Sequence, residues 1–434
     1  MKKIINLLVI FLINDALNGQ VLNLEEAISI ALSNNHGILI AQQEEAALKT
    51  GIHPGAAGLL PTLSANSAAS YSYSSTNQEF NGGIFPAIEG MEASQNNQSA
   101  KVAASYLLFN GGARIKLYSK LKTSGSLYEL QTKITIESTL IQVINAYCEV
   151  VRVQNQLELV QKSMEISLDR LRRTQIINDF GNASKLDLLN AKVDLNFDSS
   201  NVLSAELNLR KAKNELNYLL GRKIALEFEV NQEVVLPELS DASDYINKAK
   251  ENNTLALLSN IQLDLADIDK KISKSNFMPV LSTNLDYGYS GSANDVGVFK
   301  SASSVGYTGS VSLKWNLFDG FKKQKALEKA QISIEVNTNK QQQILLNIEK
   351  EVQNYYDALL QNSKLLMLQT ENRAVAKLNL ERSENLLKNG SITNMQFRQA
   401  QLNLLQIDYQ INNLRYTIKV LDYQLLRMIN ELVK

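Results

Sequence analysis

The fold of this chain is indicated by a sequence repeat. The stretch Leu108-Phe109-Asn110-Gly111 recurs as Leu317-Phe318-Asp319-Gly320 at an offset of 209 residues. The same offset aligns Tyr147 with Tyr356, Gly181 with Gly390, Ala191 with Ala400 and Leu216 with Leu425. Further upstream, an offset of 218 aligns Ile28, Ala31, Asn34, Asn35 and Pro61 with Ile246, Ala249, Asn252, Asn253 and Pro279. The sequence therefore predicts two copies of one structural unit, and the nine-residue change of offset predicts a longer loop in the first copy.

Both copies show the same order of elements. The first copy, 21–221, predicts a helical segment over about 24–58, strands over about 62–74 and 100–109, a long helix over about 113–178 and a helix over about 184–220. Residues 222–242 form a linker. The second copy, 243–434, predicts a helical segment over about 243–276, strands over about 280–290 and 306–318, a long helix over about 322–387 and a helix over about 393–431.

The long helices are permitted by where proline is absent. All five prolines lie outside 87–236 and 280–434, and proline breaks helix interiors. The last helix carries apolar residues at spacings of three and four, which is typical of a coiled-coil seam: Leu404, Ile407, Ile411, Leu414, Ile418, Leu421, Leu425 and Met428. Its counterpart in the first copy keeps the heptad spacing but breaks at Asp198. These stripes favour helix packing over a ligand site.

The predicted strands alternate with a period of two. In the second copy Leu281, Thr283, Leu285, Tyr287 and Tyr289 face one way, and serine, asparagine, aspartate and glycine face the other. The segments 75–98 and 291–305, rich in Asn, Ser and Gly, are expected to be loops. Each strand should therefore have one apolar, aromatic face and one polar face.

Such strands fit a membrane only in a closed barrel, because unpaired backbone groups cannot be left in lipid. The smallest outer-membrane barrels have about eight strands, so more than one chain must contribute. The aromatic residues are then expected to face lipid or anchor at its interface: Tyr71, Tyr73, Tyr106, Tyr287, Tyr289, Tyr307 and Trp315. A soluble β-sandwich core is the alternative, but helices of this length are awkward for it.

The ends and the composition set further limits. Lys2 and Lys3 followed by a mostly apolar run predict a signal peptide over 1–20. The charges cancel, with 44 basic and 44 acidic residues, which gives no reason to propose nucleic acid as a partner. Cys148 is the only cysteine and is expected to be a packed core thiol.

Catalysis finds little support in the sequence. The two histidines, His36 and His53, have no cysteine or second histidine at metal-ligand spacing. No phosphate-binding loop, dinucleotide motif or nucleophile elbow occurs. We expect no catalytic residue, no metal and no cofactor.

The order of elements, the duplication and three motifs resemble the TolC family of outer-membrane efflux proteins. The motifs are Leu60-Pro61-x-Leu63, the Leu-Phe-Asn/Asp-Gly pair, and Gly-x-x-Ser/Thr at residues 181–184 and 390–393. The resemblance implies an α+β membrane protein in the outer membrane of a Gram-negative bacterium. It implies a homotrimer whose twelve-stranded β-barrel continues into a twelve-helix α-barrel through the periplasm. It also implies an exit duct for efflux or type I secretion, docked to a periplasmic adaptor and an inner-membrane pump.

The resemblance also implies roles for the helical turns. Residues at the turns would meet the adaptor: Gly181, Asn182, Ser184, Gly390, Ser391 and Thr393. Residues just beyond them would narrow the closed entrance: Asp187, Asn190, Gln396 and Gln399. TolC itself has two aspartates six and nine residues past the second glycine, where this chain has the two glutamines. In its second copy this chain therefore departs from the acidic entrance of that family member.

Two other classes stay open on sequence grounds. A periplasmic adaptor would need one helical hairpin rather than two, and a soluble coiled-coil scaffold would leave the strand pairs and signal peptide unexplained.

Overall fold

The computed structural model describes residues 21–82, 86–181, 184–231, 237, 240–296 and 299–432, so the predicted signal peptide lies outside the described residues. The described chain folds as two units. The helical unit takes its described residues from Met1–Gln43, Thr132–Ala256 and Leu345–Lys434, and the strand-bearing unit comprises Glu44–Gln131 and Leu257–Ile344. Each unit contains chain from both sequence copies, so the duplication and the folding units do not coincide.

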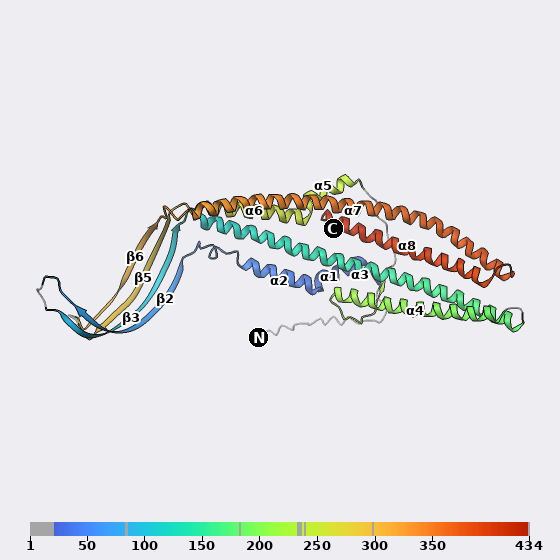
Figure 1. Ribbon diagram of the computed structural model, residues 1–434, viewed down its shortest axis with the longest axis horizontal. Coiled ribbons are helices and arrows are strands. Elements are labelled where there is room, and N and C mark those ends of the chain that lie inside the picture. The colour runs from blue at the N-terminus through green and yellow to red at the C-terminus, as the bar shows by residue number, and fades with distance from the viewer. Residues whose placement is uncertain are drawn as a thin grey trace, which may run out of the picture. The chain divides into compact units, whose positions relative to one another are not determined.

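The strand-bearing unit holds one antiparallel sheet in the order β2-β3-β5-β6. Its strands are β2 (Thr62–Gln78), β3 (Ile88–Phe109), β5 (Val280–Asn294) and β6 (Ser301–Lys314). Figure 1 shows them running side by side as one curved sheet. β3 of the first copy pairs with β5 of the second, so the two hairpins form a single surface. Within the chain, β2 and β6 are the edge strands.

All four strands extend into segments that the sequence predicted as loops. β2, β3 and β5 extend into the expected loops 75–98 and 291–305, and β6 begins at Ser301 rather than near 306. The reason is pairing: Gln95 of β3, for example, lies opposite Ser72 on one side and Asn294 on the other. A neighbouring strand on both sides satisfies the backbone whatever the side chains are. The first copy's extra residues therefore lengthen its strands as well as its turn.

β6 also ends earlier than predicted, at Lys314 instead of 318. Lys314 pairs with Val280, the first residue of β5. Pro279 comes immediately before and has no N–H to donate, so residues beyond Lys314 have no partner on that strand.

The helical segment expected at the start of each copy is two helices, which corrects the prediction. These are α1 (Leu24–Asn34) and α2 (His36–Thr50), then α5 (Ala242–Asn252) and α6 (Thr254–Ser275). The break falls at Asn35, whose Oδ1 accepts a bond from Ile38 N at 3.2 Å and whose Nδ2 donates to Leu219 O at 2.7 Å. Asn253 does the same toward Leu255 N and Met428 O, both at 2.9 Å. Each asparagine stabilises an extended backbone that ends one helix and caps the next.

The long helices have identical lengths in the two copies. α3 (Ala113–Asp179) and α7 (Lys322–Lys388) have 67 residues each, and α4 (Lys185–Leu219) and α8 (Asn394–Met428) have 35 each. In the helical unit, Leu140, Ile144 and Val151 of α3 pack with Leu216 of α4 in the core. Among the described residues no helix is both long and apolar enough to cross a membrane.

A short pair of strands that the sequence did not predict contributes Leu22 and Val230 to this core. β1 (Val21–Leu22) pairs in parallel with β4 (Glu229–Val230), which lies in the segment predicted as a linker. Tyr147 on α3 donates its hydroxyl hydrogen bond to Leu22 O at 3.0 Å. Its neighbour Cys148 is buried as predicted, and burial raises the pKa of its thiol to about 12.

Candidate functional site

The first helical turn joins α3 to α4 in the helical unit. Gly181 has a φ of 77°, a left-handed conformation that glycine adopts without strain, and its N–H donates to Asn178 O at 2.8 Å. Ser184 then caps α4, because its Oγ accepts a bond from Asp187 N at 3.1 Å. Asn182, one of the predicted turn residues, lies outside the described residues.

The second turn joins α7 to α8 and is closed more completely. Gly390 has a φ of 70°; its N–H donates to Leu387 O at 3.0 Å, and Ser391 N donates to Leu386 O at 2.9 Å, which is the Schellman arrangement. Thr393 and Gln396 form a capping box: Thr393 N donates to Gln396 Oε1 at 2.9 Å, and Gln396 N donates to Thr393 Oγ1 at 3.3 Å. The described turn residues Gly181, Ser184, Gly390, Ser391 and Thr393 are all exposed.

The residues predicted to narrow an entrance all lie within the first two turns of α4 or α8. Asp187 is half-buried and accepts a bond from Ser184 Oγ at 2.7 Å. Asn190, Gln396 and Gln399 are exposed, and Gln399 donates to Asn403 at 2.8 Å. Within the described part of the chain, the hydrogen bonds of Asp187, Gln396 and Gln399 stay inside their own helix and its cap.

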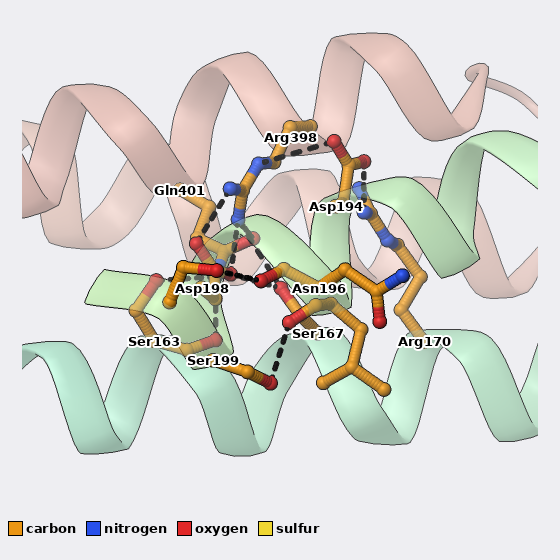
Figure 2. Close-up of polar contacts among 11 residues, drawn as sticks. Ser163, Ser167, Arg170, Asp194, Asn196, Asp198, Ser199, Arg398 and Gln401 are labelled. Atoms are coloured by element: carbon orange, nitrogen blue, oxygen red, sulfur yellow. Dashed lines mark hydrogen bonds and ion pairs between the residues drawn. The ribbon is translucent and has the colours of Figure 1, made fainter. Parts of the chain in front are cut away.

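A buried polar cluster lies further along the helices from these turns. Figure 2 shows that its side chains come from α3, α4 and α8. The guanidinium of Arg398 donates to both oxygens of Asp198 at 2.7 Å each. Arg398 also bonds Ser167 Oγ and Gln401 Oε1, both at 3.1 Å. Asp198 is 2% exposed and Arg398 is 8% exposed, so the pair is almost fully desolvated. Paired charges of this kind persist in an interior only with good geometry and added hydrogen bonds, both of which are present.

Two further contacts extend the cluster. Gln401 Nε2 donates to both the carbonyl and the hydroxyl oxygen of Ser163 at 3.0 Å. Asp194 lies 3.9 Å from Arg398 Nε and pairs with Arg170, which is 4% exposed. Sequence reasoning missed this cluster, although the heptad break at Asp198 was a signal for it. The break exists because this position packs a cation from the other copy.

A cleft of about 380 Å³ lies beside the cluster, within the helical unit. Its lining is mostly apolar, from α3, α7 and α8, with Ile166, Leu380 and Phe397 among the contributing residues. Charged side chains form part of its wall: Arg173 bonds Asp169 at 3.1 Å and lies 3.6 Å from Glu384. The Lys388 ammonium, bonded to Glu384 at 2.8 Å, lowers the pKa of that carboxyl group.

In the strand-bearing unit, the register places the predicted tyrosines on one face of the sheet. Their cross-strand partners alternate in step, as when Tyr287 lies opposite both Val102 and Tyr307. Most of the set is exposed: Tyr71 (66%), Tyr73 (59%), Tyr287 (49%), Tyr289 (42%) and Tyr307 (80%). Tyr106 differs, since it is half-buried beneath the guanidinium of Arg114, 5.0 Å from the ring centroid. A face with this many exposed aromatic rings requires an apolar neighbour.

The opposite face of the sheet is polar and made of small side chains. A shallow hollow of about 340 Å³ on it is lined mainly by serine and asparagine, including Ser70, Asn97 and Ser290. The register also places two charged residues on this face of the sheet. Lys101 of β3 lies opposite Gly288 of β5, and Asp286 lies two residues before Gly288. This face is suited to contact with water.

Among the described residues, no group of three or more His, Cys, Asp or Glu side chains could hold a metal ion. The geometry instead consists of an amphipathic sheet, two capped helical turns and a buried cross-copy cluster.

Comparison with known proteins agrees with that architecture. The model of the family "Outer membrane efflux protein" matches residues 27–222 and 245–431. The chain is 23% identical over 402 residues to "Outer membrane protein TolC" of Vibrio cholerae, covering 91% of this chain and 87% of that protein.

Solved structures share the fold. The CmeC outer membrane channel of Campylobacter jejuni has a TM-score of 0.78 at 15% identity, with 95% of this chain and 86% of that chain covered. A structure of CusC has a TM-score of 0.76 at 18% identity, covering 94% and 91%. The open state of the MtrE outer membrane channel of Neisseria gonorrhoeae has a TM-score of 0.73 at 15% identity, covering 94% and 89%.

Proposed function

We propose that three copies of this chain, which belongs to the family of outer membrane efflux proteins, close one β-barrel and one helical duct. Membership in this family makes the protein an outer-membrane exit channel of an efflux system, with a long periplasmic extension. The family is a transport family. We propose in addition where the duct docks to its partner and where its entrance narrows.

The observation that carries the proposal is the four-stranded sheet with two free edges. β2 and β6 each have one unpaired side within the chain, and the sheet has one aromatic, exposed face and one polar face. In a bilayer the unpaired backbone groups of both edges must find partners. β6 of one copy and β2 of the next would pair antiparallel, which continues the alternation already present in the sheet. Three copies then supply twelve strands, with the tyrosines toward lipid and the serine-rich face toward the lumen.

Cysteine cross-linking between the two edges tests this closure. Single cysteines placed along β2, at polar-face positions such as Ser70, are combined with single cysteines along β6, such as at Ser304. Closure predicts disulfide-linked trimers for a set of pairs shifted by a constant register. A ladder ending at dimers, or no cross-link between these edges, would overturn the three-copy barrel.

We infer that the two helical turns dock a periplasmic adaptor protein, which connects the duct to an inner-membrane pump. The turns are supported by helix caps and present exposed loop residues, including Ser391 and Thr393. A photo-reactive amino acid at Ser391 should capture the adaptor in intact cells. The same group at Lys340 is the control, because this exposed position lies closer to the start of α7 than to the turn. Equal capture at both positions would contradict docking at the turns.

The entrance is proposed to be narrowed by Asp187, Asn190, Gln396 and Gln399. Support comes from their position in the first turns of α4 and α8, next to the docking loops. With two glutamines in the second copy, the entrance carries less negative charge than paired aspartates would give. Transport through it is passive, and the chain has no catalytic role in our proposal.

A further inference from the structure

The junction between β6 and α7 contains an unusual backbone. Phe321 has a φ of 66° in the left-handed region, directly after Gly320 with a φ of 69°. In the first copy the aligned position is Gly112, with a φ of 76°. Glycine adopts this conformation freely, whereas a bulky residue there is a rare outlier. The second copy therefore keeps a phenylalanine where its own fold would be better served by glycine, which points to a role for the ring.

The ring of Phe321 lies on the surface with another aromatic ring. Phe318 and Phe321 make an edge-to-face pair with centroids 5.4 Å apart and planes at 88°, and the residues are 69% and 60% exposed. Trp315, 59% exposed, lies three residues earlier and is held by a bond from its Nε1 to Phe277 O at 3.1 Å. Trp315 also follows Val311 and Leu313 in the alternation that forms the aromatic face of β6. The aromatic face of β6 thus leads to Trp315, and the exposed pair of Phe318 and Phe321 follows within six residues of it.

Positive charge follows immediately in the chain. Lys322 is exposed, and the side chain of Lys325 is 75% exposed although it contacts Glu328 at 2.6 Å. At the aligned positions the first copy has no exposed cation. Lys322 aligns with Ala113, and Lys325 aligns with Lys116, which is half-buried and donates to Ser275 Oγ at 2.8 Å. Of the two junctions, the second therefore combines exposed rings with exposed ammonium groups.

We propose that this second junction is an anchor for anionic phospholipid. Aromatic rings prefer the boundary between acyl chains and head groups, and lysines beside them attract anionic head groups. Phe318 and Phe321 enter the lipid at the rim of the sheet, while Lys322 and Lys325 bind phosphate and glycerol head groups of the adjoining leaflet. The inference rests on the proposed function, in which the aromatic face of the sheet meets lipid, and on the position of the exposed rings directly after β6.

The chain contains a single tryptophan, Trp315, which makes a direct test possible. The full-length protein is reconstituted in vesicles of phosphatidylethanolamine with a minor fraction of phosphatidylglycerol. In parallel samples either the first or the second lipid carries brominated acyl chains, which quench tryptophan fluorescence on contact. At equal bromine content the brominated phosphatidylglycerol should quench Trp315 more strongly.

The variant K322Q/K325Q should lose this preference. Each lysine is expected to account for about a fivefold enrichment of anionic lipid at low ionic strength, and salt should weaken it. K340Q/K377Q removes the same charge from exposed positions on the same helix and should behave as the unchanged protein. F321G should lower quenching by both lipids while leaving the protein folded, since glycine suits the local φ.

The outcomes separate the anchor from the channel itself. Equal quenching by both brominated lipids, unchanged in K322Q/K325Q, would overturn the anionic-lipid anchor while leaving the membrane channel intact. Absence of quenching by either lipid would instead count against a bilayer location of the sheet. If F321G dissociated the oligomer without altering quenching, the rings would serve a contact between copies and the proposal would fail.

Discussion

The ion pair between Arg398 and Asp198 allows a quantitative test of how the two sequence copies are joined in the helical unit. D198N removes the charge from a carboxylate whose side chain is 3% exposed and that accepts two 2.7 Å bonds from the guanidinium. Arg398, 9% exposed at its side chain, would keep Asp194 at 3.9 Å as its nearest carboxylate. Removing one partner of a buried pair costs about 3–5 kcal/mol. Because an amide oxygen still accepts one bond, we expect about 3 kcal/mol.

Hydrogen–deuterium exchange in detergent is the appropriate assay, because it reports local opening without requiring reversible unfolding. A loss of about 3 kcal/mol speeds exchange by roughly two orders of magnitude in peptides of α4 and α8 around the pair. D169N is the matched control, since Asp169 and Arg173 form an exposed pair with side chains 56% and 46% exposed. Such pairs contribute about 0–1 kcal/mol, so exchange should change by at most about fivefold.

A double substitution separates charge burial from packing. D198L/R398M replaces both charges with apolar side chains of similar size, which is often neutral when both partners are removed together. Exchange should then return close to that of the unchanged protein. If D198N exchanged no faster than D169N, or if the double variant showed the sum of the single effects, the pair would not be what joins α8 to α3 and α4.

Three other perturbations have defined outcomes. Q396D/Q399D should increase divalent-cation block of single-channel current, and unchanged block would show that these side chains do not face the constriction. Burial raises the pKa of Glu137 above its ordinary 4.5, so the ionised carboxyl group opposes folding at pH values above 4.5. E137Q should therefore raise the melting temperature at neutral pH and have no effect below pH 4.5. A lower melting temperature of E137Q at neutral pH would contradict this sign. N35A removes the 2.7 Å bond to Leu219 O and a helix cap, which should cost about 2–3 kcal/mol in thermal unfolding; a cost under about 0.5 kcal/mol would show that the helix break does not depend on this side chain.

The sequence was most informative where one local property was sufficient. The Phe-x-Gly motifs and the glycine turns placed the starts of the four long helices within one residue, and the absence of proline permitted their length. Strand lengths were less accessible. The serine- and asparagine-rich part of β3 is a strand because of its neighbours, and pairing partners far along the chain, such as Asn294 for Gln95, leave no local signal.

The sequence did not predict the two helix breaks or the buried cluster, and the physical reason is the same for both. Asn35 ends α1 because Leu219 O, 184 residues later, accepts its amide hydrogen bond. Asp198 is tolerated in a core position because Arg398, 200 residues away, lies against it. A polar residue in an apolar stripe shows that a partner is required, but its identity depends on the packing of helices from both copies.

Differences between the copies carry the most specific information, since equal helix lengths show that one backbone plan serves both. Gly221 and Asn430 occupy aligned left-handed positions, with φ of 64° and 62°. Asparagine tolerates this conformation, so the backbone alone does not require glycine. At Gly221, however, a Cβ atom would lie 2.4 Å from Asn34 O, and this crowding requires glycine in the first copy. No such contact explains the less suitable residue at Phe321, and the lipid anchor proposed for the second junction would supply a constraint there from outside the chain.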